Sequence, residues 1–169
     1  SEEDIKMKVC KFGGTSMANA NTISRVVKII ENDSDRKIIV VSAPGKRDKA
    51  DIKITDILYQ CYDEVEKTGK CDKSFKIIVD RFNTIISELK IKLDITDLLK
   101  KMKSEFEKEK SKDYIASRGE YLSALILAKK LGFEFIDAAD LIKFNDDEEL
   151  QLEYSYVLIA QKLKKIKKA

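Results

Sequence analysis

The chain has 169 residues, of which 43% are hydrophobic and 37% are charged, and its 33 basic and 30 acidic side chains leave a formal net charge of +3. This composition is typical of one folded domain, and its balanced charge argues against a protein that binds nucleic acid or a membrane surface. The chain contains no histidine, which excludes mechanisms with a histidine base, and its three cysteines are too widely spaced for a zinc or disulfide framework.

The first third of the chain predicts a βαβ unit. Two short β-branched runs, residues 6–12 and 37–43, are typical of buried parallel strands. Between them, apolar residues recur at the spacing of an amphipathic helix: Ile23, Val26, Val27 and Ile30. Pro44 and Gly45 then end the second strand and open a polar loop.

The rest of the chain predicts a helical block followed by a third strand. Helical spacing recurs over residues 54–65, 75–89 and 95–106, and we interpret these stripes as packed core. A helix over residues 117–132, capped by Gly132, leads to a strand at 133–137. A final helix is predicted from Glu148, with an apolar stripe of Leu152, Tyr156, Ile159, Leu163 and Ile166. The cysteines, Cys10, Cys61 and Cys71, are predicted to be reduced and mostly in the core.

Neither end of the chain carries the pattern of a targeting signal or of a membrane-binding segment. The opening SEEDIK lacks the basic and apolar regions of a secretory signal, and no apolar run is long enough to span a bilayer, so a cytoplasmic location is expected. The lysines of KLKKIKKA, residues 162–169, suit a helix C-terminus better than a nucleic-acid patch. The acidic residues of NDDEEL, 145–150, are interpreted as the first turn of the last helix, and no metal ligand is predicted.

The stretch KVCKFGGTS, residues 8–16, carries the main chemical signal. Adjacent glycines after a strand let several backbone N–H groups face a bulky anion. Lys11 adds a positive charge, and Thr15 and Ser16 add hydroxyl donors. A phosphate-binding turn is therefore one interpretation. An ordinary strand-to-helix turn is the other, because glycines serve that purpose too.

Three motifs in order make the chain resemble the aspartokinases of the amino acid kinase superfamily: KFGGTS at 11–16, VVSAPG at 40–45, and SRGEYLSA at 117–124 before FIDA. The resemblance implies an α/β fold, the three-layer αβα amino acid kinase (carbamate kinase-like) fold. It covers the N-terminal half, with a mainly parallel sheet and a helical block. Residues 1–169 would be the N-terminal portion of the catalytic domain, without the C-terminal nucleotide-binding half or the regulatory ACT domains.

The resemblance also implies a reaction. It is the ATP-dependent phosphorylation of the L-aspartate β-carboxylate to 4-phospho-L-aspartate, the first step of lysine, threonine and methionine biosynthesis. The expected partners are L-aspartate, ATP with its bound Mg²⁺, and a second copy of the protein in a homo-oligomer. No base is needed, because the carboxylate is already ionised near neutral pH. The alternatives are an amino acid kinase acting on another carboxylate, or a non-catalytic homologue that binds an acidic ligand or a partner.

By the same resemblance, Lys11 would contact the transferred phosphoryl group and would bind ATP together with residues 12–16, namely Phe12, Gly13, Gly14, Thr15 and Ser16. Thr55 would contact aspartate, and Glu120 would orient its α-amino group. Each of these two residues also has a structural interpretation. Thr55 could cap the helix that follows, and Ser117 with Glu120 fits a capping box.

The chain taken alone is expected to be inactive, because the implied second phosphate loop lies outside it. We also expect one edge of the sheet to be open. The chain would then self-associate, or its last helix would fold over the exposed sheet.

Overall fold

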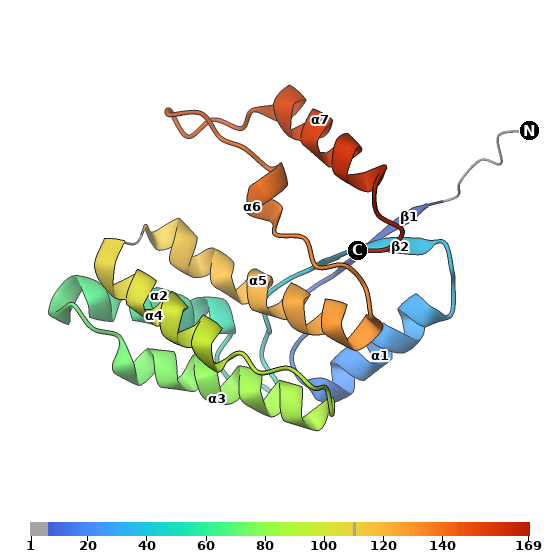
Figure 1. The fold of residues 1–169 in the computed structure, drawn as a ribbon. Coiled ribbons are helices and arrows are strands. Elements are labelled where there is room, and N and C mark those ends of the chain that lie inside the picture. The colour runs from blue at the N-terminus through green and yellow to red at the C-terminus, as the bar shows by residue number, and fades with distance from the viewer. Residues whose placement is uncertain (1–6, 110) are drawn as a thin grey trace, which may run out of the picture.

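A computed structural model describes residues 7–109 and 111–169 (Figure 1). The elements in chain order are β1 (Lys8–Phe12), α1 (Ala20–Glu31), β2 (Arg36–Val41), α2 (Ile54–Thr68), α3 (Asp72–Glu88), α4 (Thr96–Glu109), α5 (Lys112–Leu131), α6 (Ala138–Leu141) and α7 (Leu152–Leu163). The predicted βαβ unit and helical block are confirmed, although residue 6 of the predicted first strand lies outside the described residues. Within the described residues, no helix is both long and apolar enough to cross a membrane.

The sheet consists of two parallel strands whose faces differ. Lys11 lies opposite Val40, and Phe12 lies opposite Val41. On one face Phe12 packs against the core and Val41 belongs to it. On the other face Val9 is 65% exposed and Val40 is 49% exposed. The helices therefore bury one face of the sheet and leave apolar side chains on the other.

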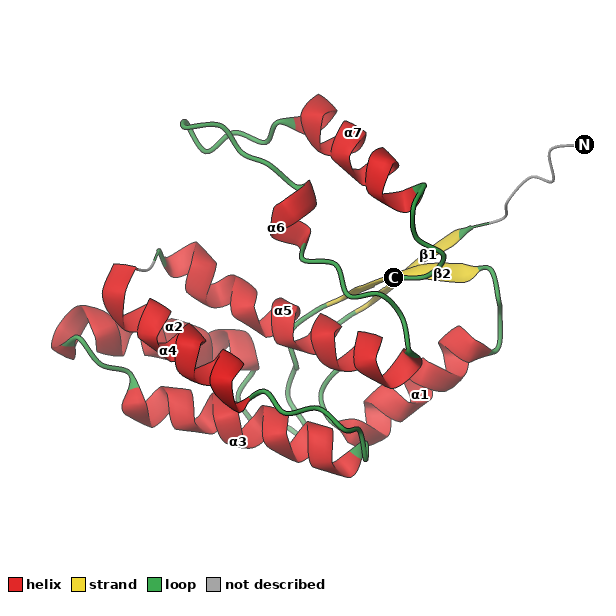
Figure 2. Ribbon diagram, in the orientation of Figure 1, coloured by secondary structure: helices red, strands yellow, loops and turns green. Residues whose placement is uncertain are grey.

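Helices α1 to α5 share one hydrophobic core, and Figure 2 shows them together on one side of the two strands. The apolar stripe predicted for α1 is buried in full, and α3 contributes the fully buried Phe82. Phe75 of α3 meets Phe106 of α4 edge to face, with the ring centroids 5.7 Å apart. The predicted core stripes are thus confirmed. Of the free cysteines, Cys61 and Cys71 are buried and Cys10 is half-buried.

The predicted third strand, residues 133–137, is wrong. This segment has no strand assignment, and its Glu134 N–H donates to Lys168 O at 3.0 Å. The place beside β2 is taken instead by Ala169, whose N–H donates to Lys37 O at 2.8 Å and whose O accepts from the Ile39 N–H at 2.7 Å. The end of the chain therefore lies between β2 and residue 134, which keeps residues 133–137 from pairing with β2.

Two helix starts also differ from the prediction. Helix α5 begins at Lys112, because the Ser111 side chain accepts a hydrogen bond from the Tyr114 N–H. Helix α7 begins only at Leu152. Residues 145–150 form a turn before it, in which the Asn145 side-chain oxygen accepts from the N–H groups of Asp147 and Glu149. The acidic run is thus a loop and not the first turn of a helix.

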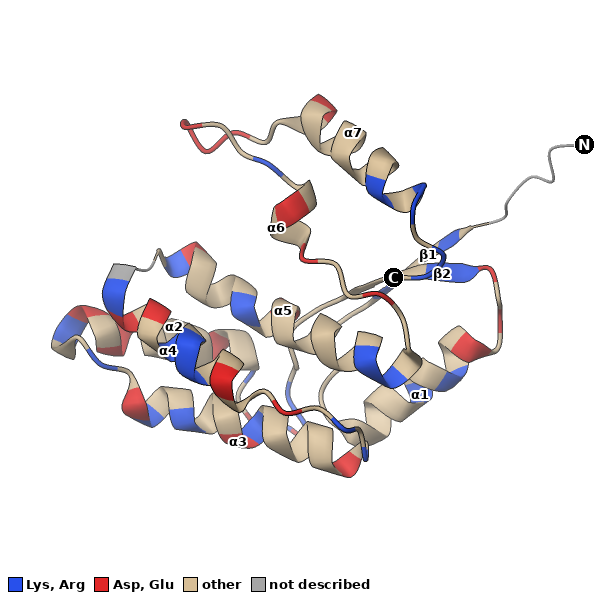
Figure 3. Cartoon of the chain, viewed as in Figure 1, with Lys and Arg blue, Asp and Glu red and all other residues tan. Residues whose placement is uncertain are grey.

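Helices α6 and α7 contact each other and stand apart from α3 in the view of Figure 1. Two residues of the predicted stripe on α7, Leu152 and Tyr156, are exposed, and the buried residue of this helix is Ser155. Its hydroxyl accepts a hydrogen bond from the Lys143 N–H at 3.0 Å. Figure 3 shows both signs of charge interspersed along the long helices, as the near-neutral composition predicts.

Candidate active site

The glycine turn joins β1 to α1 through backbone hydrogen bonds. The Ser16 N–H donates to Gly13 O at 3.0 Å, and the Met17 N–H donates to Gly14 O at 3.1 Å. Asn19 then caps α1 in a reciprocal capping box with Thr22. A Cβ placed on Gly13 would meet nothing within 4 Å. The surface at Gly13 is therefore open, which leaves room for a large ligand.

Gly14 has a different role, since it packs against Gly45 of the loop after β2. The Gly45 N–H donates to Gly14 O at 2.8 Å. A Cβ on Gly45 would lie 2.7 Å from the Gly14 carbonyl carbon, a distance that side chains do not reach. The two glycines thus let two loops touch through their backbones.

Gly119 brings a third segment equally close. A Cβ at this position of α5 would lie 2.6 Å from the Ala43 Cβ and 3.2 Å from a methyl group of Leu58. Glycine in a helix interior costs about 1 kcal/mol relative to alanine, so its presence here reflects the close packing. The next residue, Glu120, is held beside the loop that follows β2.

A cleft of about 430 Å³ opens where these segments meet. It is lined by residues from four parts of the chain: Gly14, Thr15, Ser42, Ala43, Pro44, Gly45, Lys46, Lys53, Thr55 and Glu120. Four of the residues singled out in the sequence are therefore brought together, namely Gly14, Thr15, Thr55 and Glu120.

The other predicted site residues lie outside the lining of the cleft. Lys11 is exposed on β1, and it is followed by the half-buried Phe12 and the exposed Gly13. Ser16 is half-buried within the turn. These residues precede or form the turn, and of the KFGGTS stretch only Gly14 and Thr15 line the cleft.

The capping interpretations of Thr55 and Glu120 are wrong. The N-cap of α2 is Lys53, which places Thr55 inside the first turn. The N-cap of α5 is Ser111, which places Ser117 and Glu120 in the middle of that helix. Thr55 and Glu120 therefore do not cap their helices, and both residues line the cleft.

Sequence reasoning missed two cationic residues of the cleft, Lys46 and Lys53. They belong to the loop predicted to be merely polar, and its run of charged residues was the available signal. With Glu120 exposed at the same cleft, the lining offers both signs of charge. Such a set can bind a ligand that carries an ammonium and an acidic group. Among the described residues, no group of three or more metal-ligating side chains gathers.

Replacing Gly119 by alanine tests the close packing of α5. The added methyl group must displace Ala43 or the helix, because the Ala43 Cβ has no freedom to move aside. We expect a loss of about 1–3 kcal/mol in the free energy of unfolding, measured by urea denaturation. Gly132→Ala is the contrasting variant, because its Cβ meets nothing within 4 Å and only its φ of +68° is strained. A Gly119 variant as stable as the wild type would contradict the packing argument.

Comparison with known proteins shows the family of the chain. The model of the amino acid kinase family matches residues 6–168. The chain is 34% identical over 140 residues to aspartokinase 3 of Bacillus subtilis, an alignment that covers 78% of this chain and 30% of that protein. It therefore spans about a third of the length of the relative it matches.

Solved structures resemble the chain as well. Clostridium acetobutylicum aspartate kinase superposes with a TM-score of 0.93 at 46% identity, covering 97% of this chain and 38% of that one. E. coli aspartokinase III in complex with aspartate and ADP superposes with a TM-score of 0.74 at 22% identity, covering 93% and 37%. The second likeness concerns the fold alone. Together they confirm the α/β fold predicted from the motifs.

Proposed function

Because the chain belongs to the amino acid kinase family, we propose that it is the N-terminal part of the catalytic domain of an aspartokinase. The complete protein would phosphorylate the β-carboxylate of L-aspartate with ATP, in the cytoplasm, as the first step of lysine, threonine and methionine biosynthesis. The similarity to proteins named aspartokinase supports this substrate.

The cleft carries the proposal. It brings Gly14 and Thr15 from the glycine turn beside Thr55 of α2 and Glu120 of α5. The turn offers backbone N–H groups to phosphate oxygens, while the Glu120 carboxylate offers a partner to an ammonium group. An amino acid and a phosphate group could therefore lie side by side.

Each residue has a distinct role in the proposed mechanism. Thr55 and Glu120 orient aspartate, so that its ionised β-carboxylate, which needs no base, can attack the γ-phosphorus of ATP as the bond to the leaving ADP breaks. The open backbone at Gly13, with Thr15 and Ser16, binds phosphate oxygens, and Lys11 neutralises charge on the transferred group. ATP supplies the phosphoryl group and would carry Mg²⁺ bound to its phosphate oxygens.

An aspartyl-hydroxamate assay on the complete protein tests the function. We expect ATP-dependent product with L-aspartate, and at least tenfold less ADP release with L-glutamate or N-acetyl-L-glutamate. Release of ADP with one of those acids alone would instead indicate another amino acid kinase. Binding without any turnover would indicate a non-catalytic homologue.

The same assay on residues 1–169 alone is expected to give no measurable turnover. The chain spans 30% of the Bacillus subtilis relative and 38% of the Clostridium acetobutylicum structure, so most of a kinase of that length lies outside it. Light scattering on the same sample would report self-association through the exposed sheet. Turnover by a chain whose mass confirms its ends would contradict this prediction. A complete enzyme is expected to be a homo-oligomer.

A further inference from the structure

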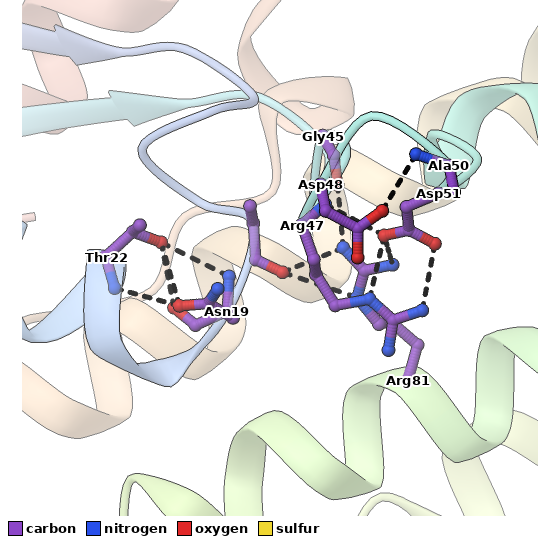
Figure 4. A network of polar contacts seen from close by, with 9 residues as sticks. Asn19, Thr22, Gly45, Arg47, Asp48, Ala50, Asp51 and Arg81 are labelled. Carbon is purple, nitrogen blue, oxygen red and sulfur yellow. Dashed lines mark hydrogen bonds and ion pairs between the residues drawn. The ribbon is translucent and has the colours of Figure 1, made fainter.

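Arg81 is a buried charged residue in the middle of α3, where its side chain is only 4% exposed. Its Nη2 donates to Ala18 O at 2.8 Å and to Gly45 O at 2.6 Å. Its Nη1 lies 3.0 Å from a carboxylate oxygen of Asp51. Figure 4 shows Arg81 reaching from α3 to the loop that carries Gly45 and Asp51. One side chain thus contacts both loops whose glycines touch at the cleft.

These contacts are costly to arrange, which indicates a specific purpose. Burial lowers the pKa of Arg81, because it disfavours the charged form. A hydrophobic residue of similar volume could fill the same space, often without loss of stability. The planar guanidinium, with five donors in a fixed fork, bonds two carbonyl groups and a carboxylate at once. The side chain therefore fixes positions as well as filling space.

The carboxylate on the loop is itself held in place. Asp51 accepts hydrogen bonds from the Arg47 N–H at 2.8 Å and from Arg47 Nε at 2.7 Å. Chiefly because of its side-chain hydrogen bond with Arg47, the pKa of Asp51 lies well below its usual range. Arg81 thus contacts a loop that is closed on itself between residues 47 and 51. Lys46, which lines the cleft, immediately precedes that closed segment.

We propose, building on the aspartokinase function above, that Arg81 is a positioning residue that holds the glycine turn and the loop after β2 in the arrangement that forms the cleft. It contacts the end of the turn at Ala18 and the start of the loop at Gly45, and it does not line the cleft itself. It affects turnover indirectly, by fixing the positions of the cleft residues Gly14, Thr15 and Lys46. No ligand contact is assigned to it.

Kinetics of the complete protein test this role. Arg81→Met fills the space but donates no hydrogen bond, and we expect kcat/KM for aspartate to fall roughly 10-fold to 100-fold, the scale for a misplaced site. Arg81→Lys should recover part of this loss. The matched control is Phe82→Leu, which perturbs the neighbouring, fully buried residue of the same helix. It should lower the melting temperature yet keep kcat/KM within threefold, when measured well below that temperature.

Hydrogen exchange gives a readout that does not depend on catalysis. The amides of Ser16, Met17 and Gly45 all donate within the two loops. Arg81→Met should speed exchange in peptides spanning residues 13–18 and 44–51, while Phe82→Leu should not. If the wild type fails to phosphorylate aspartate, the proposed function is wrong, yet exchange still decides the role of Arg81.

Two outcomes would overturn the positioning role. One is an Arg81→Met protein with unchanged exchange in both peptides and kcat/KM within threefold of the wild type. The other is an equal fall in kcat/KM, with equally faster exchange, in the Arg81→Met and Phe82→Leu proteins. That result would mean that the arginine only stabilises the fold. If Arg81→Met does not fold, the same comparison of kcat/KM and hydrogen exchange is made with Arg81→Lys and Asp51→Asn, and the same outcomes would overturn the positioning role.

Discussion

Replacing Lys11 by alanine in the complete protein is expected to lower kcat by roughly 10² to 10³, the scale for losing one preorganised electrostatic group. Lys11 is the residue before Phe12 at the end of β1, directly ahead of the glycine turn. Its charge would oppose the negative charge on the transferred phosphoryl group. The KM for aspartate should change much less, because aspartate is assigned to Thr55 and Glu120.

Lys8→Ala is the matched control, because Lys8 is an exposed lysine on the same strand. Its ammonium pairs with Asp33 at 2.6 Å, and an exposed pair of this kind contributes little to stability because water and salt screen it. The kcat of the Lys8→Ala protein should equal that of the wild type. If the Lys11 variant keeps kcat within about threefold, less than 1 kcal/mol of barrier, Lys11 has no catalytic role.

Glu120→Gln is expected to raise the KM for aspartate roughly 10-fold to 100-fold. The physical reason is the loss of a charge-assisted hydrogen bond to the substrate ammonium, which contributes about 1.5–3 kcal/mol. Steady-state kinetics and thermal melts on the same sample separate binding from stability. Because Glu120 is exposed and does not cap α5, the melting temperature should change little.

The control for this variant is Glu66→Gln, a substitution of an exposed glutamate of α2 that does not line the cleft. It should leave both KM and the melting temperature unchanged. A Glu120→Gln protein with wild-type KM but a clearly lower melting temperature would show that the carboxylate stabilises the fold and does not bind aspartate.

The parts of the fold that the sequence predicts depend on local pattern. Val26, Val27 and Ile30 recur at helical spacing, and the helix forms where that spacing lies. Gly132 ends the predicted helix, and it caps α5 with a left-handed φ of +68°. Periodicity and a capping glycine act within a few residues, so a linear reading can find them.

The errors arose where residues outside the motif decide the structure. Residues 133–137 have the composition of a strand, but pairing requires a free neighbour, and Ala169 lies in that place beside β2. The S-x-x-E pattern at Ser117 matched a capping box, yet the helix already begins at Lys112. A short motif cannot show whether a helix has started upstream of it.

The candidate site was predicted only in part, because only some of its residues belong to local motifs. Gly14, Thr15, Thr55 and Glu120 belong to recognisable motifs, and the fold brings them to one cleft. Lys46 and Lys53 lie in a charged loop, and no sequence pattern specifies which of its side chains face the cleft. Arg81 looks like one more charged residue of an amphipathic helix, and only its burial distinguishes it.

The separation of the Arg81 contacts along the chain also orders events during synthesis. Arg81 follows Ala18 by 63 residues and Gly45 by 36 residues. A nascent chain emerges from the ribosome N-terminus first, at about 5–20 residues per second. The glycine turn and the loop after β2 therefore leave the ribosome several seconds before the side chain that joins them. Until α3 has emerged, the carbonyl groups of Ala18 and Gly45 lack the guanidinium that bonds them in the folded chain, so Arg81 can join the two loops only after both have left the ribosome.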